Sequence, residues 1–391
     1  MRSKTIAQVL SILSPSIVLR ALAMDIFIPC LPMVAKEFNA SFGAAQWVLS
    51  IYFIGAGLGQ LVMGPLADHF GRRKVILSSI VLFAVSSILC AGANSIYELI
   101  FFRLLQGIGA CGTTVVTLAI VRDLFEDHAT PKVYSYVNSI IALAPILAPL
   151  LGGSLLVWTG TWRSCFYFVT VFSLLAFAVN YFYLKETNPR FAVDVQLEKI
   201  KLLSNYREIF TNKLFLIFTC CSIAGLSGLF LFFSMSAILL IDILAVAPDN
   251  YGYYFGFNSI IYLCGNMLSP KLQQKLGSDR VIKIGSGLAL LGAVVMLLWH
   301  WQLGLSKTGL LAPNLLITFG IGLIFGPCMA GAMRNFKHIA GMASASYGAL
   351  LYCISALIVA WVMQYQISNT LPLAIMILIM SVFSLLILRK V

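Results

Sequence analysis

The chain has 391 residues, of which 60% are hydrophobic and only 10% are charged. Its mean hydropathy is +0.95. A typical soluble domain contains about 25% charged residues, and a soluble fold of this length has too little interior to cover so many apolar side chains. The composition therefore excludes a soluble globular protein. It predicts an all-α membrane protein, because a helix satisfies its own backbone hydrogen bonds in lipid.

Apolar stretches long enough to cross a bilayer, about 20 residues each, follow one another along the chain. The predicted helices cover residues 6–30, 44–66, 75–94, 96–121, 133–157 and 163–184, and then 213–241, 250–272, 280–302, 309–333, 339–363 and 371–389. We therefore predict roughly twelve transmembrane helices in two six-helix halves. The longest polar stretch divides them into an N-terminal half (1–184), a cytoplasmic linker (185–212) and a C-terminal half (213–391).

The formal net charge of +12 raises the possibility of nucleic-acid binding. The basic residues, however, concentrate in alternate loops and near both ends of the chain, where Arg2, Lys4, Arg389 and Lys390 lie. The opposite loops contain only Lys36, Arg163 and Lys307. Cytoplasmic loops of membrane proteins carry an excess of Lys and Arg. The charge pattern thus predicts that both termini are cytoplasmic, and it argues against a nucleic-acid partner.

The sequence contains no phosphate-binding glycine loop, no histidines with metal-ligand spacing and no nucleophile motif. Its nine cysteines fall in or at the ends of apolar stretches, where free cysteine packs as a small hydrophobic residue. We therefore expect no enzymatic activity, no metal site and no bound cofactor. Without an ATP site, an ion gradient must drive the protein, or it is a facilitator.

The segment Gly64–Lys74 contains three cations, one acid and two glycines between two apolar stretches. Its charges can serve simply to set topology on a solvated loop. Asp68 contributes nothing to such a role, so we predict a cluster of Asp68, Arg72 and Asp123 that holds the cytoplasmic face closed in one conformation. The neighbouring residues assigned to this conformational switch are Gly64, Gly71 and Arg122.

The helix predicted at 133–157 contains Pro145, Pro149, Gly152 and Gly153. Proline bends a transmembrane helix, and glycine lets another backbone approach closely. Packing alone can explain the glycines, but two prolines four residues apart predict a kink or pivot. We therefore add these four residues to the conformational switch.

Ionisable side chains inside a membrane are costly and are functional candidates by default. Asp25 lies near the outer end of the first predicted helix, and Arg103 lies at a similar depth in the fourth, at about 1.5 Å per residue. We predict that Asp25, with Arg103 nearby, takes up and releases a proton as its exposure alternates. The alternative is a static ion pair that fixes helix packing.

Polar and aromatic residues within the spans are candidates for a substrate cavity around Asp25. They are Tyr52, Asn138, Phe233, Asn258, Tyr262 and Tyr347. For each of them, hydrogen bonding between helices or anchoring at the membrane interface is an equal alternative. The second half has no clear buried acid, which indicates a largely apolar and aromatic cavity suited to amphiphilic organic molecules.

Several segments together resemble the major facilitator superfamily of secondary transporters. Gly64–Lys74 is similar to its loop motif between helices 2 and 3, and Arg103 with Gln106 and Gly107 is similar to its helix 4 motif. Ala144–Gly153 resembles its helix 5 antiporter motif, although Ala144 stands where many members have glycine. The resemblance extends to twelve-helix drug:proton antiporters of the bicyclomycin/chloramphenicol-resistance type, through Asp25–Pro32, Val121–Phe125, Phe230–Ser234 and Gly341–Ala345.

This resemblance implies a proton-coupled exporter of drugs or other small amphiphilic molecules that works by alternating access in the bacterial inner membrane. It places substrate and proton near Asp25 and Arg103, and it gives Asp68, Arg72 and Asp123 a role in closing the inner face. The expected partners are an organic substrate, protons and the bilayer, with no cofactor beyond the proton gradient. We expect a monomer.

Three alternatives remain at this stage. The first is a dedicated metabolite or siderophore exporter of the same fold. The second is an uptake symporter, against which the Pro/Gly pattern of 144–153 argues. The third is a transporter-like receptor without transport, which would need a large soluble domain that this sequence does not contain.

Overall fold

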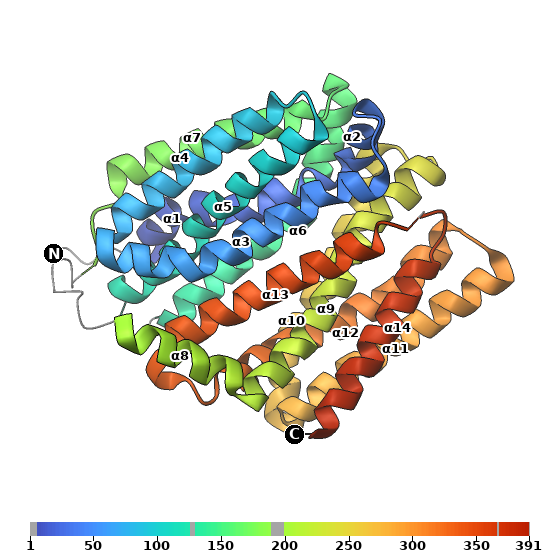
Figure 1. The fold of residues 1–391 in the computed structure, drawn as a ribbon. Helices are drawn as coiled ribbons and strands as arrows, with labels where there is room; N and C mark the ends of the chain where they lie inside the picture. Colours follow the sequence, from blue (N-terminus) through green and yellow to red (C-terminus); the bar gives the residue numbers. More distant parts are fainter. Residues whose placement is uncertain (1–5, 126–129, 189–198, 366, 391) are drawn as a thin grey trace.

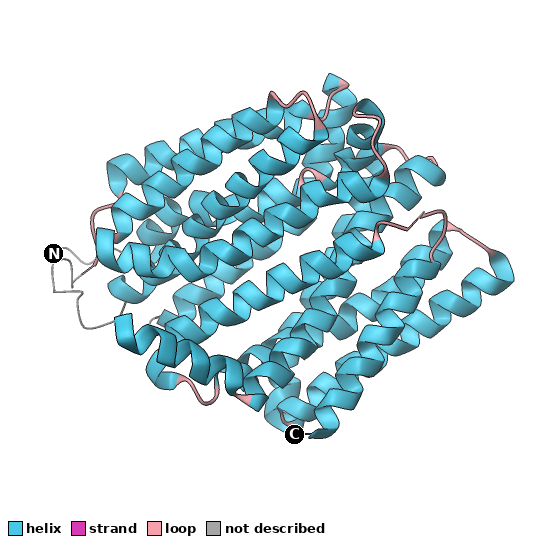
Figure 2. Cartoon of the chain, in the orientation of Figure 1, coloured by secondary structure: helices cyan, strands magenta, loops and turns pink. Residues whose placement is uncertain are grey.

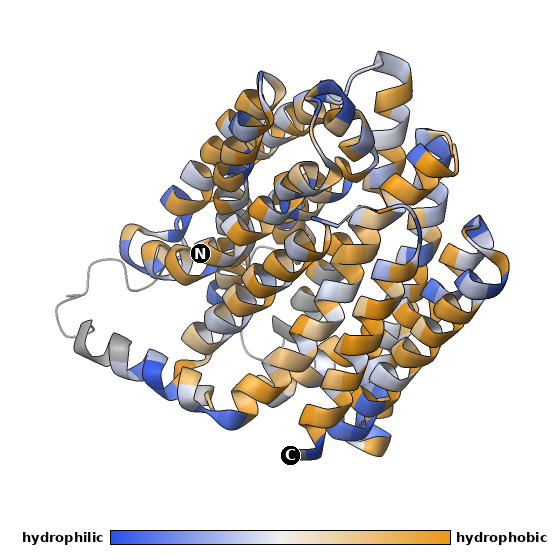
Figure 3. Cartoon of the chain, turned by 45° about the vertical axis from the view of Figure 1, so that its right-hand side comes forward, coloured by the Kyte–Doolittle hydropathy of each residue, from blue (hydrophilic) through white to orange (hydrophobic). Residues whose placement is uncertain are grey.

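The computed structural model describes residues 6–125, 130–188, 199–365 and 367–390. Within these ranges every regular element is a helix and none is a strand (Figure 2). This confirms the predicted all-α class. Ten stretches of the described residues are long and apolar enough to cross a membrane. Figure 3 shows hydrophilic residues gathered toward the helix ends and in α8. The chain is therefore a multi-pass membrane protein.

The first group of helices comprises α1 (Ile6–Asp25), η1 (Ile28–Cys30), α2 (Leu31–Glu37), α3 (Phe42–Phe70), α4 (Arg72–Ala91), α5 (Ile96–Leu124), α6 (Thr130–Thr159) and α7 (Arg163–Tyr183). The second comprises α8 (Lys199–Thr211), α9 (Lys213–Ala237), the π-helical η2 (Ile238–Ile243), α10 (Pro248–Leu276), α11 (Ser278–Leu303), α12 (Lys307–Met333), η3 (Lys337–Ile339), α13 (Ala340–Val362), α14 (Leu371–Ile387) and η4 (Leu388–Lys390). Figure 1 shows α1–α7 on one side and α9–α14 on the other, with α2 and α8 at opposite ends of the bundle.

Large aromatic residues mark the end of the bundle at which α2 lies, called here the α2 end. Tyr97 at the start of α5 is 81% exposed, and Trp158 at the end of α6 is 80% exposed. Trp301 and Trp361, near the ends of α11 and α13, are also exposed. Tyr and Trp favour the boundary between hydrocarbon and water. They therefore mark one membrane surface.

The first predicted span does not form one helix. Helix α1 ends at Asp25, and the chain continues through η1 into α2. In a continuous helix, the carbonyl of Asp25 would accept from residue 29, and that of Ile28 from residue 32. Both donors are missing because Pro29 and Pro32 have no N–H group. The break places Asp25 at the end of a helix inside the protein.

The predicted loop at Gly64–Lys74 is mostly helical. Helix α3 extends through Pro65 to Phe70, and α4 begins at Arg72, so Gly71 alone makes the turn. Gly71 has φ 93°, a conformation that a Cβ atom disfavours. Gly277, with φ 82°, makes the same one-residue turn between α10 and α11. The two halves of the chain therefore repeat this corner.

The two groups of helices meet closely along α6. A Cβ atom at Gly153 would overlap the carbonyl oxygen of Pro248 at the start of α10, and one at Gly152 would overlap that of Ile26 within its own group. Pro149 lacks the N–H that would bond to the carbonyl of Pro145. The hydroxyl of Ser259 on α10 lies 3.2 Å from that carbonyl and shares its single proton between it and the carbonyl of Phe255, at 2.9 Å. The proline pair thus leaves an acceptor that a side chain of the opposite group of helices approaches.

We predict that Gly153→Ala lowers the melting temperature of the purified protein, because the added methyl overlaps the α10 backbone. Overpacking of this kind costs about 1–3 kcal/mol. Gly287→Ala on α11 is the matched control, since no atom lies within 4 Å of its Cβ position and alanine favours the helix. Thermal unfolding in detergent measures both variants. Equal melting temperatures for the two would contradict the close contact.

Candidate functional site

Asp25 is buried, with 5% of its surface exposed, at the point where α1 ends. Among the described residues, no Lys, Arg or His lies within ion-pair distance of its carboxylate; the ion pairs formed lie elsewhere. Keeping an unpaired carboxylate ionised in a low-dielectric interior is costly. Asp25 therefore remains a candidate for a residue that exchanges a proton.

Arg103 on α5 is fully buried and does not pair with Asp25 in this structure. Its Nε donates to the carbonyl of Val48 at 3.1 Å, and Nη1 donates to the carbonyl of Ala23 at 3.2 Å. Nη1 also donates to Oε1 of Gln106 at 2.6 Å. The predicted static ion pair is thus absent, and Arg103 ties α5 to α1 and α3 at the level of Asp25.

The carbonyl of Ala23 is available because α1 tightens before it ends. In a regular helix the N–H of Phe27 would donate to the carbonyl of Ala23. Here it donates to the backbone carbonyl of Met24 instead, at 3.3 Å. Arg103 takes the freed acceptor, and its guanidinium lies 4.3 Å from the ring centre of Tyr52. The break in α1 and the buried arginine therefore depend on each other.

Arg20 is a candidate that the predicted site did not include. Its Nη1 donates to the hydroxyl of Tyr352 on α13 at 3.0 Å, and its guanidinium lies 5.2 Å from that ring's centre. Tyr52 donates to the Arg20 backbone carbonyl at 2.7 Å. Arg20 precedes Asp25 by five residues on the same helix. A lone arginine within an apolar span was the signal that could have found it.

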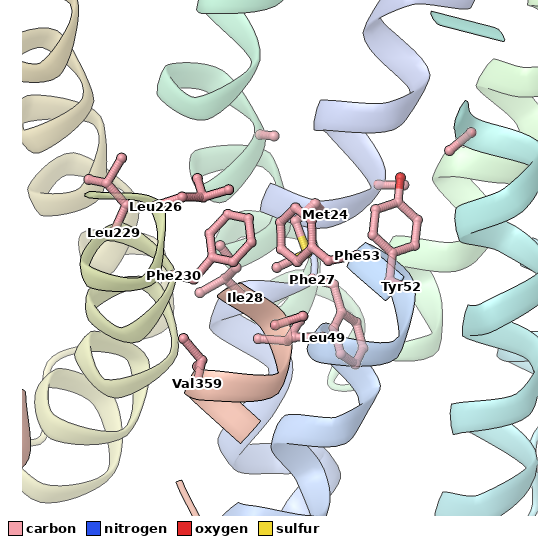
Figure 4. Close-up of a cluster of buried hydrophobic side chains, with 14 of the residues drawn as sticks. Met24, Phe27, Ile28, Leu49, Tyr52, Phe53, Leu226, Leu229, Phe230 and Val359 are labelled. Carbon is pink, nitrogen blue, oxygen red and sulfur yellow. The ribbon is translucent and has the colours of Figure 1, made fainter. Parts of the chain in front are cut away.

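Aromatic rings from both groups of helices stack beside this region (Figure 4). Phe53 on α3 lies between Phe230 on α9, at a centroid distance of 3.7 Å, and Tyr352 on α13, at 5.8 Å. Phe233 continues the row, 6.4 Å from Phe230 and 4.7 Å from Phe255. Of the predicted cavity residues, Tyr52 therefore lies next to the polar groups of α1, and Phe233 lies in this stack.

The other predicted cavity residues do not gather there. Asn258 accepts from Nδ2 of Asn314 at 2.9 Å and from Thr318 at 3.0 Å, and Tyr347 donates to Ser222 at 2.6 Å. These contacts match the alternative of hydrogen bonding between helices. Tyr262 packs against Phe325, and the side chain of Asn138 lies outside the described residues.

The predicted cluster around Arg72 forms at the end of the bundle opposite α2. Its Nη2 contacts Oδ1 of Asp68 at 2.7 Å, and its Nε donates to Oδ2 of Asp123 at 2.9 Å. The cluster joins α3, α4 and α5. Arg122 is exposed and stays outside it, and no atom lies within 4 Å of the Cβ position of Gly64.

Glu186, which the sequence analysis missed, holds the start of α4. Its carboxylate accepts from the backbone N–H groups of Arg72 at 2.9 Å and Arg73 at 3.1 Å, and from those of Thr187 and Asn188 at 3.0 Å. Partial burial tends to raise the pKa of Glu186, but these four donors outweigh it and lower the pKa below its usual value. The segment after α7 is thereby fastened to the α3–α4 corner.

At the α2 end, an ion pair between Lys36 on α2 and Asp242 on η2 links the two groups of helices. Glu37 accepts from Nε1 of Trp162 at 2.6 Å and pairs with Arg163, which fixes α2 to the start of α7. Together with the contact between Gly153 and Pro248, these bonds hold the bundle together at this end.

The chain belongs to the Major Facilitator Superfamily, whose family description it matches over residues 13–360. It is 30% identical to the "Chloramphenicol resistance protein" of Pseudomonas aeruginosa, over 91% of this chain and 84% of that protein. It is 25% identical to the "Bicyclomycin resistance protein homolog" of Haemophilus influenzae, over 90% of this chain and 87% of the relative. These relatives confirm the resemblance inferred from the motifs.

Solved structures support the fold alone. The chain superposes on a D-xylose-proton symporter with a TM-score of 0.78 at 18% identity, covering 97% of each chain. An inward-facing bacterial homologue of the lysosomal transporter Spinster gives a TM-score of 0.73 at 15% identity, covering 98% of this chain and 97% of that one. The fold alone therefore does not identify the substrate of this chain.

We predict that Glu186→Gln lowers the melting temperature at neutral pH, and that this difference shrinks as the pH falls. The native pKa lies below the unfolded value of about 4.3, so the carboxylate's contribution is present above that pH and disappears as the pH falls through the native pKa. Thermal unfolding from neutral to acidic pH measures it. The exposed neighbour Lys185→Gln serves as control, and a pH-independent offset for Glu186→Gln would contradict this assignment.

Proposed function

We propose that this protein is a proton-coupled antiporter that exports small amphiphilic organic molecules from the cytoplasm by alternating access. The observation that carries the proposal is Asp25, a buried carboxylate without an ion-pair partner, at the break of α1. Asp25 follows Arg20 on α1, and Arg20 contacts Tyr352 in the aromatic stack that joins the two groups of helices. The names of the relatives, which are drug-resistance proteins, support export.

The topology proposed for this mechanism has twelve spans. The ten apolar stretches are supplemented by α10, which has 29 residues, and by the shorter apolar α14. An even number of spans puts both termini on one side, and the basic loops assign that side to the cytoplasm. In this topology the α8 end is cytoplasmic and the α2 end faces outward.

The contacts at the α2 end support a state closed to the outside. For the protein to open outward, the ion pair between Lys36 and Asp242 and the backbone contact between Gly153 and Pro248 would both have to separate. The Asp68–Arg72–Asp123 cluster lies within one group of helices at the α8 end. We assign it to bracing α3, α4 and α5 as a unit, with the proposed role of engaging the opposite half when the inner face closes.

In this scheme Asp25 releases its proton when the site faces the cytoplasm, where substrate binds, and takes up a proton when it faces the outside. Arg103 holds α1 and α3 in place around it through the carbonyls of Ala23 and Val48. The proton gradient supplies the energy and the protein acts as a monomer. A dedicated metabolite exporter would use the same steps, and a broad substrate panel separates the two.

The test is transport by the purified protein in proteoliposomes with an imposed pH gradient and chloramphenicol as substrate. We expect gradient-driven accumulation by the wild type. Asp25→Asn should reduce it to the level of protein-free vesicles, because the neutral side chain cannot exchange a proton. Glu98→Gln, which changes an exposed acid at the start of α5, should transport normally. Gradient-driven accumulation by Asp25→Asn would overturn the assignment of the proton site.

Reversing the gradient in the same vesicles separates export from uptake. In an antiporter, substrate and proton move in opposite directions, whereas in a symporter they move together. Movement of chloramphenicol in the direction of the proton flux would overturn the proposal in favour of a symporter.

A further inference from the structure

Arg20 is a cation in the last third of α1 that forms no ion pair with a described carboxylate. Among the described residues, no Asp or Glu lies within ion-pair distance of its guanidinium. Its recorded side-chain partner is a neutral phenol, the hydroxyl of Tyr352. A guanidinium has five N–H donors and prefers planar or anionic acceptors. Arg20 therefore has the capacity to bind an acceptor group that enters beside it.

The walls beside Arg20 are aromatic and come alternately from the two groups of helices. The Tyr352 ring lies against Arg20, the Phe53 ring is nearly parallel to Tyr352 at 15°, and Phe230 stacks on Phe53. Because Phe53 belongs to α3 and its two neighbours belong to α13 and α9, any separation of the halves parts these rings. The gap that opens accepts a flat ring, for which stacking is favourable.

The region around Arg20 carries a net positive charge. Among the described residues, the charged side chains on this part of α1 or bonded to it are Arg20, Asp25 and Arg103, two cations and one acid. An organic cation entering here meets two fixed positive charges, whereas an acceptor or anion meets a cation that lacks a carboxylate. Specificity can rest on such repulsion as much as on attraction.

We propose that Arg20 and Tyr352 form the polar end of a substrate subsite, and that Phe53 and Phe230 form its apolar wall. The subsite takes aromatic molecules that carry a hydrogen-bond-accepting or anionic substituent, such as a nitro or carboxylate group, and rejects lipophilic cations. The inference rests on the proposed function and specifies its substrate class. The entering acceptor replaces the Tyr352 hydroxyl on Arg20, which releases a bond between the two halves.

Equilibrium binding to the purified full-length protein tests the inference without any gradient. The probes are chloramphenicol, its analogue with the nitro group reduced to an amine, 4-nitrobenzoate and tetraphenylphosphonium. The first two differ only in an acceptor replaced by a donor. We expect chloramphenicol and 4-nitrobenzoate to bind more tightly than the amine and the phosphonium. Equal affinities for chloramphenicol and its amine would overturn the proposal with no variant needed.

The variants assign this preference to residues. Arg20→Gln should lower the affinity for chloramphenicol and 4-nitrobenzoate by about tenfold, the effect of losing a charge-assisted hydrogen bond. It should leave the affinity for the phosphonium unchanged or higher. Arg20→Lys should retain part of the preference, because it keeps the charge but loses the planar donors. Tyr352→Phe should strengthen acceptor binding, because it removes the hydroxyl that competes for Arg20.

Lys307→Gln, at an exposed position at the start of α12, is the charge-matched control and should bind every probe as the wild type does. Equal weakening of acceptor and cation probes by Arg20→Gln would mean a general structural role and would overturn the subsite. Selective binding in a protein that shows no proton-driven transport would uphold the subsite and reject the proposed function. Proton-driven transport without acceptor selectivity would uphold the proposed function and reject the subsite.

Discussion

Lipid offers no hydrogen-bonding partner, and this constraint governs the centre of the molecule. A donor buried there is costly unless it finds an acceptor within the protein. Arg103 finds one because α1 tightens before its end, which frees the carbonyl of Ala23 from the N–H of Phe27. The prolines that follow Asp25 stop the helix from resuming its regular pattern. The same break therefore positions an acid inside the protein and supplies the acceptor that holds α1 against α5.

A second consequence of the lipid surroundings concerns the contacts between the two groups of helices. Among the described residues, few hydrogen bonds and ion pairs join them. Arg20 bonds to Tyr352, Ser259 shares its hydroxyl proton between the carbonyls of Pro145 and Phe255, and Lys36 pairs with Asp242. Each joins a helix of one group to a helix of the other, so each must break or rearrange when the groups move apart. By contrast, the Arg72 cluster and Glu186 connect elements of a single group. The protein thus separates contacts that rigidify a half from contacts that hold the halves together.

The motifs allowed much of this arrangement to be predicted. The Asp68–Arg72–Asp123 cluster followed from an acid that topology alone did not explain, and the close approach at Gly152 and Gly153 followed from residues without side chains. The pairing of Asp25 with Arg103 was wrong for this structure. Matched depth was estimated along two helices, but depth does not fix the rotation of either helix, and Arg103 turns toward backbone carbonyls. Glu186 was missed because its partners are N–H groups, which leave no trace in the sequence.

The sequence by itself determined that this protein crosses a membrane, which spans carry the prolines and glycines that bend helices or allow close contact, and which ionisable residues lie within the spans. These properties depend on local composition, on proline and glycine, and on the cost of charge in lipid, all of which act within one or two helical turns. Only the tertiary structure decided which of those residues meet. Partners such as Arg20 and Tyr352 lie 332 positions apart, and the rotation and packing of whole helices bring them together.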